Sequence, residues 1–372
     1  MIRVLQVLGT IGLGGAESRV MDLYRHMDRD KIRFDFLVTE GTDDHYRKEI
    51  EDMGGRVYHL PAFRIVNLMQ YKKACNDFFS EHCKDGVSEY AAVHGHMTST
   101  ASIYLPIAKK WGVPLTIAHA RSAGTDPGLK GYATRVLRNN LYKKCDRMLA
   151  CSDLAGDSVF GKGRDHEFIP NAIDTAAYAY DPSGRKVIRD KYGIGENEKL
   201  IGHVGSFRFA KNHGFIIDIF EKLIIKHPDY RLMLAGDGGL KRDIEDKVKA
   251  LGLSDRVIFT GNVSPVAPYY SAFDILLFPS VYEGMPGTVV EAEAAGLPCL
   301  ISDTITGQVV ITDKVTQMSL DCSASEWAHR LAGIEADTDR SNVVTLSGEK
   351  LSDTLYDVNM QVGYYMRLYG VV

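Results

Sequence analysis

Residues 199–238 read KLIGHVGSFRFAKNHGFIIDIFEKLIIKHPDYRLMLAGDG. The apolar run 199–207 predicts a buried strand, residues 213–228 place apolar side chains at helical spacing, and residues 230–238 predict another buried strand. A strand, a helix and a strand in this order form a parallel βαβ unit with a right-handed crossover. The stretch therefore predicts an α/β fold built on a parallel sheet.

The same alternation runs through the rest of the chain. Further strands are expected at 2–9, 33–40, 56–62, 90–97, 114–120, 147–152, 256–261, 273–280 and 298–303. Helices are expected at 15–28, 45–54 and 240–253. Both periodicities break between residues 168 and 186, where Pro170, Pro182 and Gly184 occur. The pattern predicts two Rossmann-like parallel-sheet domains with a cleft between the carboxyl ends of their strands.

Composition is that of a soluble globular protein. The chain has 372 residues, of which 45% are hydrophobic and 25% charged, enough for two domains with their own cores. The apolar start lacks a basic segment and a cleavage site, which favours a buried first strand over a signal peptide. The sequence contains no run of about 18 apolar residues, so no membrane-spanning helix is expected. The six cysteines form no CxxC pair, and this pattern indicates reduced cytosolic thiols and a cytoplasmic location.

Charge is divided unevenly along the chain. The net charge is −4, but residues 1–170 hold 24 Lys and Arg against 21 Asp and Glu. This balance argues against general nucleic-acid binding and leaves room for a locally basic surface. The basic residues of the stretch 130–147 are Lys130, Arg135, Arg138, Lys143, Lys144 and Arg147. A basic amphipathic stretch suits peripheral contact with the inner face of a membrane or with a diphospholipid acceptor, whereas a solvated helix face is the alternative.

Residues 281–298, VYEGMPGTVVEAEAAGLP, place two glutamates eight positions apart. The strand before them ends near Ser280, and a helix is expected from about Pro286 to Gly296. Glu283 then lies in the loop at the carboxyl edge of the sheet, and Glu291 lies in the helix. Free amides at the start of such a helix bind phosphate or sugar hydroxyls. The alternative is that both glutamates are solvated surface residues.

This Glu-x7-Glu segment, with Pro-Ser before it and Ala-Gly-Leu-Pro after it, resembles the retaining, nucleotide-sugar-dependent glycosyltransferases of the GT-B fold. The likeness covers nearly the whole chain and is nearest to bacterial enzymes that build capsular, exopolysaccharide or O-antigen chains. It implies an acceptor-binding domain at 1–170, a nucleotide-sugar-binding domain at 171–355, and a last helix, 356–372, that returns to the first domain. It also implies transfer of a hexose-type sugar, from a UDP-sugar, to a glycan or lipid-linked saccharide.

The resemblance assigns roles to residues of the second domain. Glu283 would hold the donor sugar near its anomeric centre, and Glu291 would accept the ribose hydroxyls. The segment between them would contact sugar and phosphate, and it comprises Gly284, Met285, Pro286, Gly287 and Thr288. The family also clamps the diphosphate with an arginine and a lysine. Lys211 matches the lysine, but Ser206 occupies the arginine position, so Arg208 is expected to share the clamp with Lys211. A surface cation is the alternative for Arg208.

In the first domain, the Gly-Gly-Ala-Glu element of the family is present as residues 14–17. Gly14 and Gly15 would let the backbone approach the acceptor and the donor phosphate. His119 matches a family histidine near the reaction centre and is expected to be catalytic together with Glu283. His96, for which a packing role is the alternative, and Arg121 are expected to line the acceptor side. His94 and His96 would share one strand face, but no third ligand spacing supports a metal site, so no metal or other cofactor is expected.

Three other functions stay open at this level. A sugar-nucleotide epimerase shares the fold. A dinucleotide-dependent oxidoreductase would use Glu40 on a ribose, but the chain lacks the GxGxxG motif. A non-catalytic protein of the same family that only binds partners is favoured by Ser206 and opposed by the presence of Glu283, Lys211 and Glu291.

Overall fold

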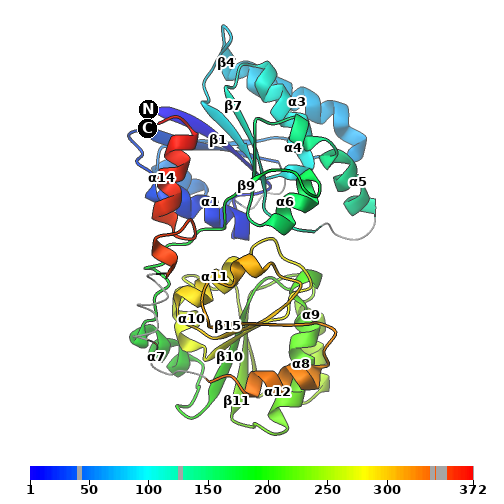
Figure 1. Cartoon of the computed structure of the whole chain (residues 1–372), viewed down its shortest axis with the longest axis vertical. Coiled ribbons are helices and arrows are strands. Elements are labelled where there is room, and N and C mark those ends of the chain that lie inside the picture. The colour runs from blue at the N-terminus through cyan, green and yellow to red at the C-terminus, as the bar shows by residue number, and fades with distance from the viewer. Residues whose placement is uncertain (40–43, 125–128, 336–339, 341–349, 372) are drawn as a thin grey trace. The chain divides into compact units, whose positions relative to one another are not determined.

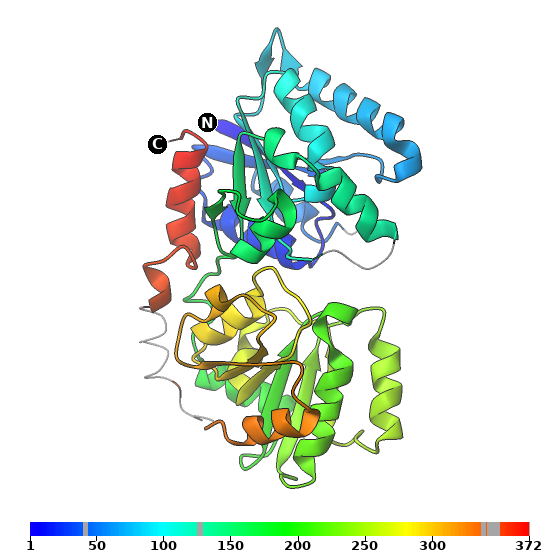
Figure 2. The ribbon, with the colours of Figure 1, turned by 45° about the vertical axis from the view of Figure 1, so that its right-hand side comes forward.

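The structure is a computed structural model that describes residues 1–39, 44–124, 129–335, 340 and 350–371, with Leu129 and Lys130 described by backbone alone. The chain divides into two compact units (Figures 1 and 2). One unit comprises residues 1–172 and 358–372, and the other comprises residues 173–357. Each unit is built on one parallel sheet, which confirms the predicted α/β class.

The first unit has a seven-stranded parallel sheet in the order β3-β2-β1-β6-β7-β8-β9. Its strands are β1 (Ile2–Leu8), β2 (Ile32–Val38), β3 (Val57–His59), β6 (Ala92–Gly95), β7 (Leu115–Ala120), β8 (Arg147–Ala150) and β9 (Glu167–Phe168). Its helices are α1 (Gly15–His26), α2 (Arg47–Asp52), α3 (Leu68–Glu81), α4 (Thr98–Lys110), α5 (Leu129–Arg138), α6 (Asp153–Phe160) and α14 (Val358–Leu368). A small hairpin, β4 (Cys83–Lys84) with β5 (Val87–Ser88), and the 3-10 turns η1 (Ile65–Asn67) and η2 (Leu141–Lys143) complete it.

The second unit has a six-stranded parallel sheet in the order β12-β11-β10-β13-β14-β15. Its strands are β10 (Lys199–Val204), β11 (Tyr230–Ala235), β12 (Val257–Gly261), β13 (Ile275–Phe278), β14 (Cys299–Ser302) and β15 (Val315–Met318). Its helices are α7 (Pro182–Lys191), α8 (His213–Ile224), α9 (Lys241–Ala250), α10 (Ala267–Ala272), α11 (Gly287–Ala294) and α12 (Ala324–Ala332), with 3-10 turns η3 (Phe209–Lys211) and η4 (Gly307–Val309). Residues 199–238 thus form β10, α8 and β11, the strand, helix and strand that were predicted.

The core of the second unit forms where helices cover this sheet. Apolar residues of β10, β11 and β13 pack against α8, whose buried face includes Ile216, Phe220 and Leu223. Trp327 of α12 is fully buried in the same cluster, and its ring meets Phe215 at a centroid distance of 5.8 Å. Because both faces of a parallel sheet must be covered, the strands are almost continuously apolar, which is why the sequence pattern located them well.

The last helix, α14, belongs to the first unit, which is where the family resemblance placed it. Helix α14 lies beside α1 in both ribbon views (Figures 1 and 2). Tyr365 and Tyr369 bury their rings, which stack at a centroid distance of 5.6 Å. Gln361 donates a hydrogen bond to the carbonyl oxygen of Pro170 at 2.6 Å. The aromatic face of the final segment therefore completes the core of the first unit.

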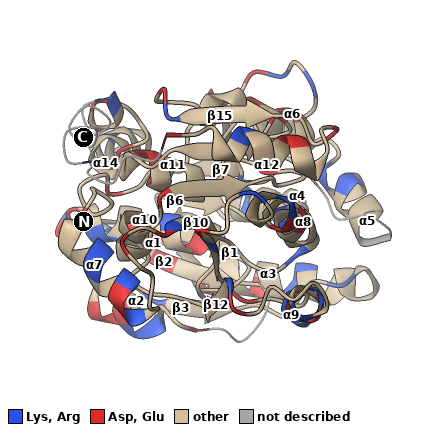
Figure 3. Ribbon diagram, turned by 90° about the horizontal axis from the view of Figure 1, so that it is seen from below, with Lys and Arg blue, Asp and Glu red and all other residues tan. Residues whose placement is uncertain are grey.

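The stretch 130–147 is not one helix. Helix α5 ends at Arg138, Asn140 adopts a left-handed conformation with φ of 60°, η2 follows, and β8 begins at Arg147. The guanidinium of Arg138 is largely buried, and this burial lowers its pKa to about 10. Tyr132, Arg135, Val136 and Lys143 are exposed. The basic surface expected from the sequence is therefore shorter, and Arg138 does not contribute to it. Figure 3 shows how Lys and Arg are distributed along the ribbon.

None of the described helices combines the length and the apolar character that crossing a membrane requires.

Candidate active site

The strand order of each sheet marks where a ligand site is expected. In the second unit, β10 lies between β11 and β13, so the chain leaves β10 and β13 toward opposite sides of the sheet. Ligands of open α/β sheets bind at the carboxyl ends of strands at such a point. The loop after β10 carries Lys211, and the loop after β13 carries Glu283. The topology thus brings together two residues that are 72 positions apart in the sequence.

Lys211 and Glu283 form an ion pair. The Nζ atom of Lys211 lies 2.8 Å from Oε1 of Glu283, and the side chains are 9% and 10% exposed. The same Nζ lies 4.5 Å from the centre of the Phe278 ring, so the cation rests on an aromatic face at the end of β13. Gly205 leaves room for the lysine stem, because a Cβ atom there would approach Lys211 Cε to 3.1 Å. A cation is therefore held rigidly at the carboxyl edge of the sheet.

The segment after Glu283 leads into α11. Gly284, Met285 and Pro286 are buried, and Pro286 is the N-cap residue rather than the first helical residue expected from the sequence. Thr288 donates a hydrogen bond to the carbonyl oxygen of Val204 at 3.3 Å, which ties the start of α11 to the end of β10. The first amides of α11, beginning at Gly287, have no acceptor within the helix. An anion or a hydroxyl group can be bound there.

Glu291 is the fifth residue of α11 and is 7% exposed. Its Oε2 atom accepts a hydrogen bond of 2.5 Å from the hydroxyl group of Tyr270, on α10. Burial, together with the nearby Glu291, raises the pKa of Tyr270 well above its usual value. The phenol therefore stays protonated and acts as a donor that orients the carboxylate.

Arg208 does not join the Lys211–Glu283 pair. Arg208 and Ser206 are both exposed, and the amide of Arg208 donates to the carbonyl oxygen of Ser206 at 2.8 Å. Among the residues that the structure describes, the Arg208 guanidinium makes no ion pair. Its assignment to the diphosphate clamp remains a prediction.

In the first unit, Gly14 is the N-cap of α1 and Gly15 is the first residue of that helix. A Cβ atom on Gly14 would lie 2.1 Å from Oε2 of Glu17, whose carboxylate also accepts from Thr10. Apart from its neighbours in the chain and the backbone of α1 itself, a Cβ atom on Gly15 would meet no atom of the described residues within 4 Å. The backbone at Gly15 is therefore open to a ligand, whereas Gly14 is needed for packing inside the turn.

Three histidines lie on one face of the first sheet. In the parallel register, Gln6 of β1 pairs with His94 of β6, and His94 pairs with Ile117 of β7. Two residues further along, His96 and His119 fall on the same face, because strand side chains alternate with a period of two. All three imidazoles are buried, and their rings approach one another to centroid distances between 4.3 and 5.5 Å.

Hydrogen bonds connect these rings to the surrounding residues. His94 bonds to the Tyr369 hydroxyl group at 2.7 Å and to Nδ1 of His119 at 3.1 Å. His96 bonds to Oε1 of Gln6 at 2.9 Å and accepts from Nε of Arg121 at 3.2 Å. Burial, strengthened by the positive charge of Arg121, lowers the pKa of each histidine well below its usual value. The imidazoles are therefore neutral at physiological pH.

The expectation that no third ligand accompanies His94 and His96 is wrong. His119 brings its nitrogen near theirs, and one nitrogen of each of the three rings lies within 4.8 Å of the others. The sequence could not show this, because His119 comes from the neighbouring strand. A metal would nevertheless compete with existing hydrogen bonds and with the positive charge of Arg121, which already donates to His96.

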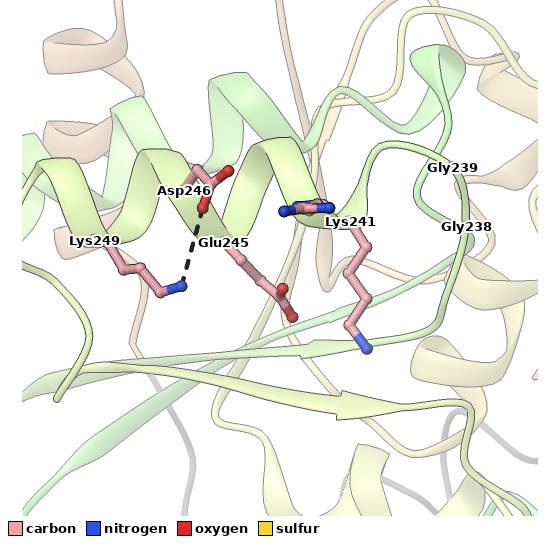
Figure 4. Close-up of a pocket in the computed structure, with 7 residues that line it drawn as sticks. Gly238, Gly239, Lys241, Glu245, Asp246 and Lys249 are labelled. Atoms are coloured by element: carbon pink, nitrogen blue, oxygen red, sulfur yellow. Dashed lines mark ion pairs between the residues drawn. The ribbon is translucent and has the colours of Figure 1, made fainter.

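A pocket of 410 Å³ lies along α9 (Figure 4). It is lined by Gly238, Gly239, Lys241, Arg242, Glu245, Asp246 and Lys249. The ammonium of Lys249 and the carboxylate of Asp246 are 3.9 Å apart across a turn of the helix. The lining contains neither Lys211 nor either predicted site glutamate, so this pocket is separate from the ion pair.

Comparison with known proteins identifies the family. Residues 13–177 match the description Glycosyltransferase Family 4, and residues 184–350 match Glycosyl transferases group 1. EpsF of Bacillus subtilis (strain 168), named as a glycosyltransferase, is 32% identical over 380 residues, covering 99% of this chain and 96% of that protein. The chain belongs to the group 1 and family 4 glycosyltransferases.

Other relatives of this glycosyltransferase bear more specific names. The UDP-Gal:alpha-D-GlcNAc-diphosphoundecaprenol alpha-1,3-galactosyltransferase of Escherichia coli is 24% identical, over 67% of this chain and 66% of that protein. A crystal structure of Anabaena Alr3699/HepE in complex with UDP and glucose is similar, with a TM-score of 0.78 at 19% identity, over 99% of this chain and 100% of that chain. This similarity confirms the GT-B fold.

Three residues of the two sites were not predicted. Tyr270 orients Glu291, while Gln6 and Tyr369 contact the histidines. Gln6 had a signal, because it is the one polar residue of the buried run VLQVL at 4–8. Tyr369 had a weaker one, as a tyrosine four residues after Tyr365 in the aromatic-rich final segment. Tyr270 had none, because its partner lies on another helix.

Proposed function

We propose that this glycosyltransferase transfers a hexose-type sugar from a UDP-sugar to a glycan or lipid-linked saccharide, with retention of anomeric configuration, in cell-surface polysaccharide biosynthesis. The observation that carries the proposal is the buried Lys211–Glu283 pair at the switch point of the second sheet, next to the start of α11. Relatives named for transfer from UDP-Gal to a diphosphoundecaprenol-linked sugar, and for capsular polysaccharide biosynthesis, support the donor, the acceptor class and the pathway. The structure of HepE with UDP-glucose supports the same donor class.

The proposed roles follow from chemistry. Lys211 neutralises the diphosphate, which gains negative charge as the glycosidic bond breaks, and a cation already in place stabilises that transition state. Glu283 holds the sugar near the anomeric carbon, with Gly284, Met285, Pro286 and the first amides of α11 around its hydroxyl groups. Glu291, oriented by Tyr270, accepts the ribose hydroxyls. In the first unit, His119, Arg121 and Gly15 are the residues that we propose contact a substrate.

Retention is proposed through attack on the face that the diphosphate leaves. The carboxylate of Glu283 is paired with Lys211, which weakens it as a nucleophile. The departing phosphate oxygen instead takes the proton of the acceptor hydroxyl group. The bond from the anomeric carbon to the diphosphate breaks as the bond to the acceptor oxygen forms. No metal is required in this scheme, and turnover in the presence of EDTA tests that point.

A panel of UDP-, GDP- and ADP-sugars, scored for binding and for nucleotide release, tests the proposal. With a saccharide acceptor, NMR of the product gives the anomeric configuration. Retention of the donor configuration supports the proposal, and inversion contradicts the mechanism. A free sugar nucleotide of changed configuration, formed without an acceptor, would indicate the epimerase instead. Glu40, on which the oxidoreductase alternative depends, lies outside the described residues.

We further propose that the enzyme is cytoplasmic and touches the inner membrane face through α5 and η2. Tyr132 and Val136 are 69% and 58% exposed, and Arg135 of the same helix and Lys143 of η2 are exposed as well. Apolar side chains among cations suit an anionic lipid surface. Sedimentation with anionic vesicles should be lost in a Tyr132→Ser, Val136→Ser variant. Equal binding to neutral vesicles, or no binding to either, would contradict this contact.

A further inference from the structure

The first unit contains a continuous chain of hydrogen bonds that ends at His119. It runs through Arg121, His96, Gln6, Tyr369, His94 and His119. Its members come from β1, β6 and β7, from the residue after each of β6 and β7, and from the end of the chain just past α14. Because a hydrogen bond has a donor and an acceptor, a chain of this kind has a direction.

The direction is fixed at the Arg121 end. A guanidinium can only donate, so Nδ1 of His96 must accept the 3.2 Å bond from Arg121 Nε. A neutral imidazole that accepts at Nδ1 carries its proton on Nε2. His96 therefore donates to Oε1 of Gln6 at 2.9 Å, and this leaves the Gln6 amide group to donate to the Tyr369 hydroxyl oxygen at 3.5 Å.

The direction is then transmitted through Tyr369. Among the described residues, its hydroxyl group has two hydrogen-bond partners, the Gln6 amide nitrogen and Nδ1 of His94 at 2.7 Å. Because an amide nitrogen cannot accept, the Tyr369 hydroxyl group donates its hydrogen bond to Nδ1 of His94. His94 consequently carries its proton on Nε2 and donates it to Nδ1 of His119 at 3.1 Å.

We propose that this chain holds His119 as the Nε2–H tautomer, and that Tyr369 is a positioning residue that acts on the reaction through His94 and His119. The Nε2 atom of His119 is buried and has no hydrogen-bond partner of normal geometry among the described residues, although a backbone interaction at Ile169 also acts on this ring. In this tautomer Nε2 can only donate, either to the backbone at Ile169 or to a substrate oxygen that reaches it, such as a sugar hydroxyl group, and it cannot serve there as a base. This inference rests on the proposed function for the role of His119 but not for its tautomer.

The helix next to Tyr369 offers a matched control. Tyr365 lies one turn earlier, is 1% exposed, and stacks on Tyr369, but its hydroxyl group has no hydrogen-bond partner among the described residues. Tyr365→Phe removes an oxygen at the same depth without breaking the chain. Tyr369→Phe removes an oxygen and breaks it.

Nitrogen-15 NMR of the full-length protein, labelled at histidine, reads which ring nitrogen carries the proton. The inference expects protonated Nε2 and unprotonated Nδ1 for His94 and His119, unchanged in Tyr365→Phe. In Tyr369→Phe, His94 loses the donor to its Nδ1, and a population of His119 protonated at Nδ1 is expected. His119 protonated at Nδ1 in the unaltered protein, or equal spectra for the two variants, would overturn the inference.

Kinetics then separates the inference from the proposed function. Tyr369→Phe should lower kcat with a UDP-sugar by about tenfold, as expected for one lost hydrogen bond, with KM for the donor nearly unchanged. Tyr365→Phe should stay within about twofold of the unaltered enzyme. If the unaltered protein turns over no nucleotide sugar, the proposed function fails, and the NMR result still decides the tautomer. If it turns over and both variants match it, the positioning role of Tyr369 is wrong.

Discussion

The ammonium of Lys211 lies 2.8 Å from the carboxylate of Glu283, although the two residues come from loops after different strands. The pair joins the two motifs on which the family resemblance depends. Each charge is about nine-tenths buried, so each is costly to leave alone. We therefore expect the pair to link the proposed donor chemistry to the stability of the second unit.

Lys211→Met tests that link. It leaves the Glu283 carboxylate buried without its cation, and the unfolding free energy in urea is expected to fall by about 3 kcal/mol. Adding Glu283→Gln removes the unpaired charge and should restore most of the lost unfolding free energy. Donor turnover of the double variant should still be at least about a hundredfold below that of the unaltered protein. A double variant no more stable than Lys211→Met would show that the pair carries no such coupling.

Two glutamates on α11 provide an internal comparison for nucleotide binding. Glu291→Gln should weaken UDP binding by about tenfold in calorimetry, because ribose loses a charged acceptor. Glu293 lies two residues further on and instead accepts hydrogen bonds from the Ile311 and Thr312 amides. Glu293→Gln should change stability and leave the UDP dissociation constant nearly unchanged. The opposite pattern would move the ribose site away from Glu291.

His213 makes stability depend on pH. Its ring stacks on Phe207 at 4.0 Å, and neither ring nitrogen has a hydrogen-bond partner among the described residues. Burial, with the nearby charge of Lys211, lowers the pKa of His213 to about 4. Between pH 6.5 and 4 the unfolded chain therefore binds a proton that the folded chain does not, so stability falls as pH falls.

His213→Phe should remove this contribution. The unfolding free energy of the variant, relative to the unaltered protein, is expected to rise by up to about 3 kcal/mol as pH falls from 6.5 to 4. The difference between the two curves isolates His213, because the other buried histidines titrate in both proteins. Parallel curves over this range would contradict the assignment.

Gly15 tests whether open backbone in the first unit serves a ligand. Outside its own helix and chain neighbours, a Cβ atom there meets no atom of the described residues within 4 Å, so Gly15→Ala and Gly15→Val should leave the melting temperature within about 2 °C of the unaltered value. Turnover should fall with side-chain size, by about tenfold or more for valine, if the donor or acceptor passes close to this backbone. Full turnover in Gly15→Val would remove Gly15 from the site.

The sequence predicted most of the fold because parallel strands are buried on both faces. The runs 232–235 and 275–278 are apolar from end to end, and they lie in β11 and β13. The basic amphipathic stretch expected at 130–147 is interrupted because Asn140 takes a left-handed conformation that the charge pattern does not reveal. Local periodicity reports burial well and chain reversals poorly.

The candidate site was predictable where its parts are contiguous. The segment from Glu283 to Glu291 lies on one βα turn, so its spacing alone suggested it. The contacts of His94 with His119 and with Tyr369 were not predictable, because strand register and the return of the last helix decide them. Such contacts are set by tertiary structure, and the sequence shows at most the residue types that take part.

The most direct test is nucleotide release from a UDP-sugar panel by the unaltered protein and by Glu283→Gln, with UDP binding measured on both. We expect release with at least one donor, a loss of about a hundredfold or more in Glu283→Gln, and UDP dissociation constants within about threefold of each other. Full release by Glu283→Gln, or no binding of any nucleotide sugar by the unaltered protein, would contradict the account.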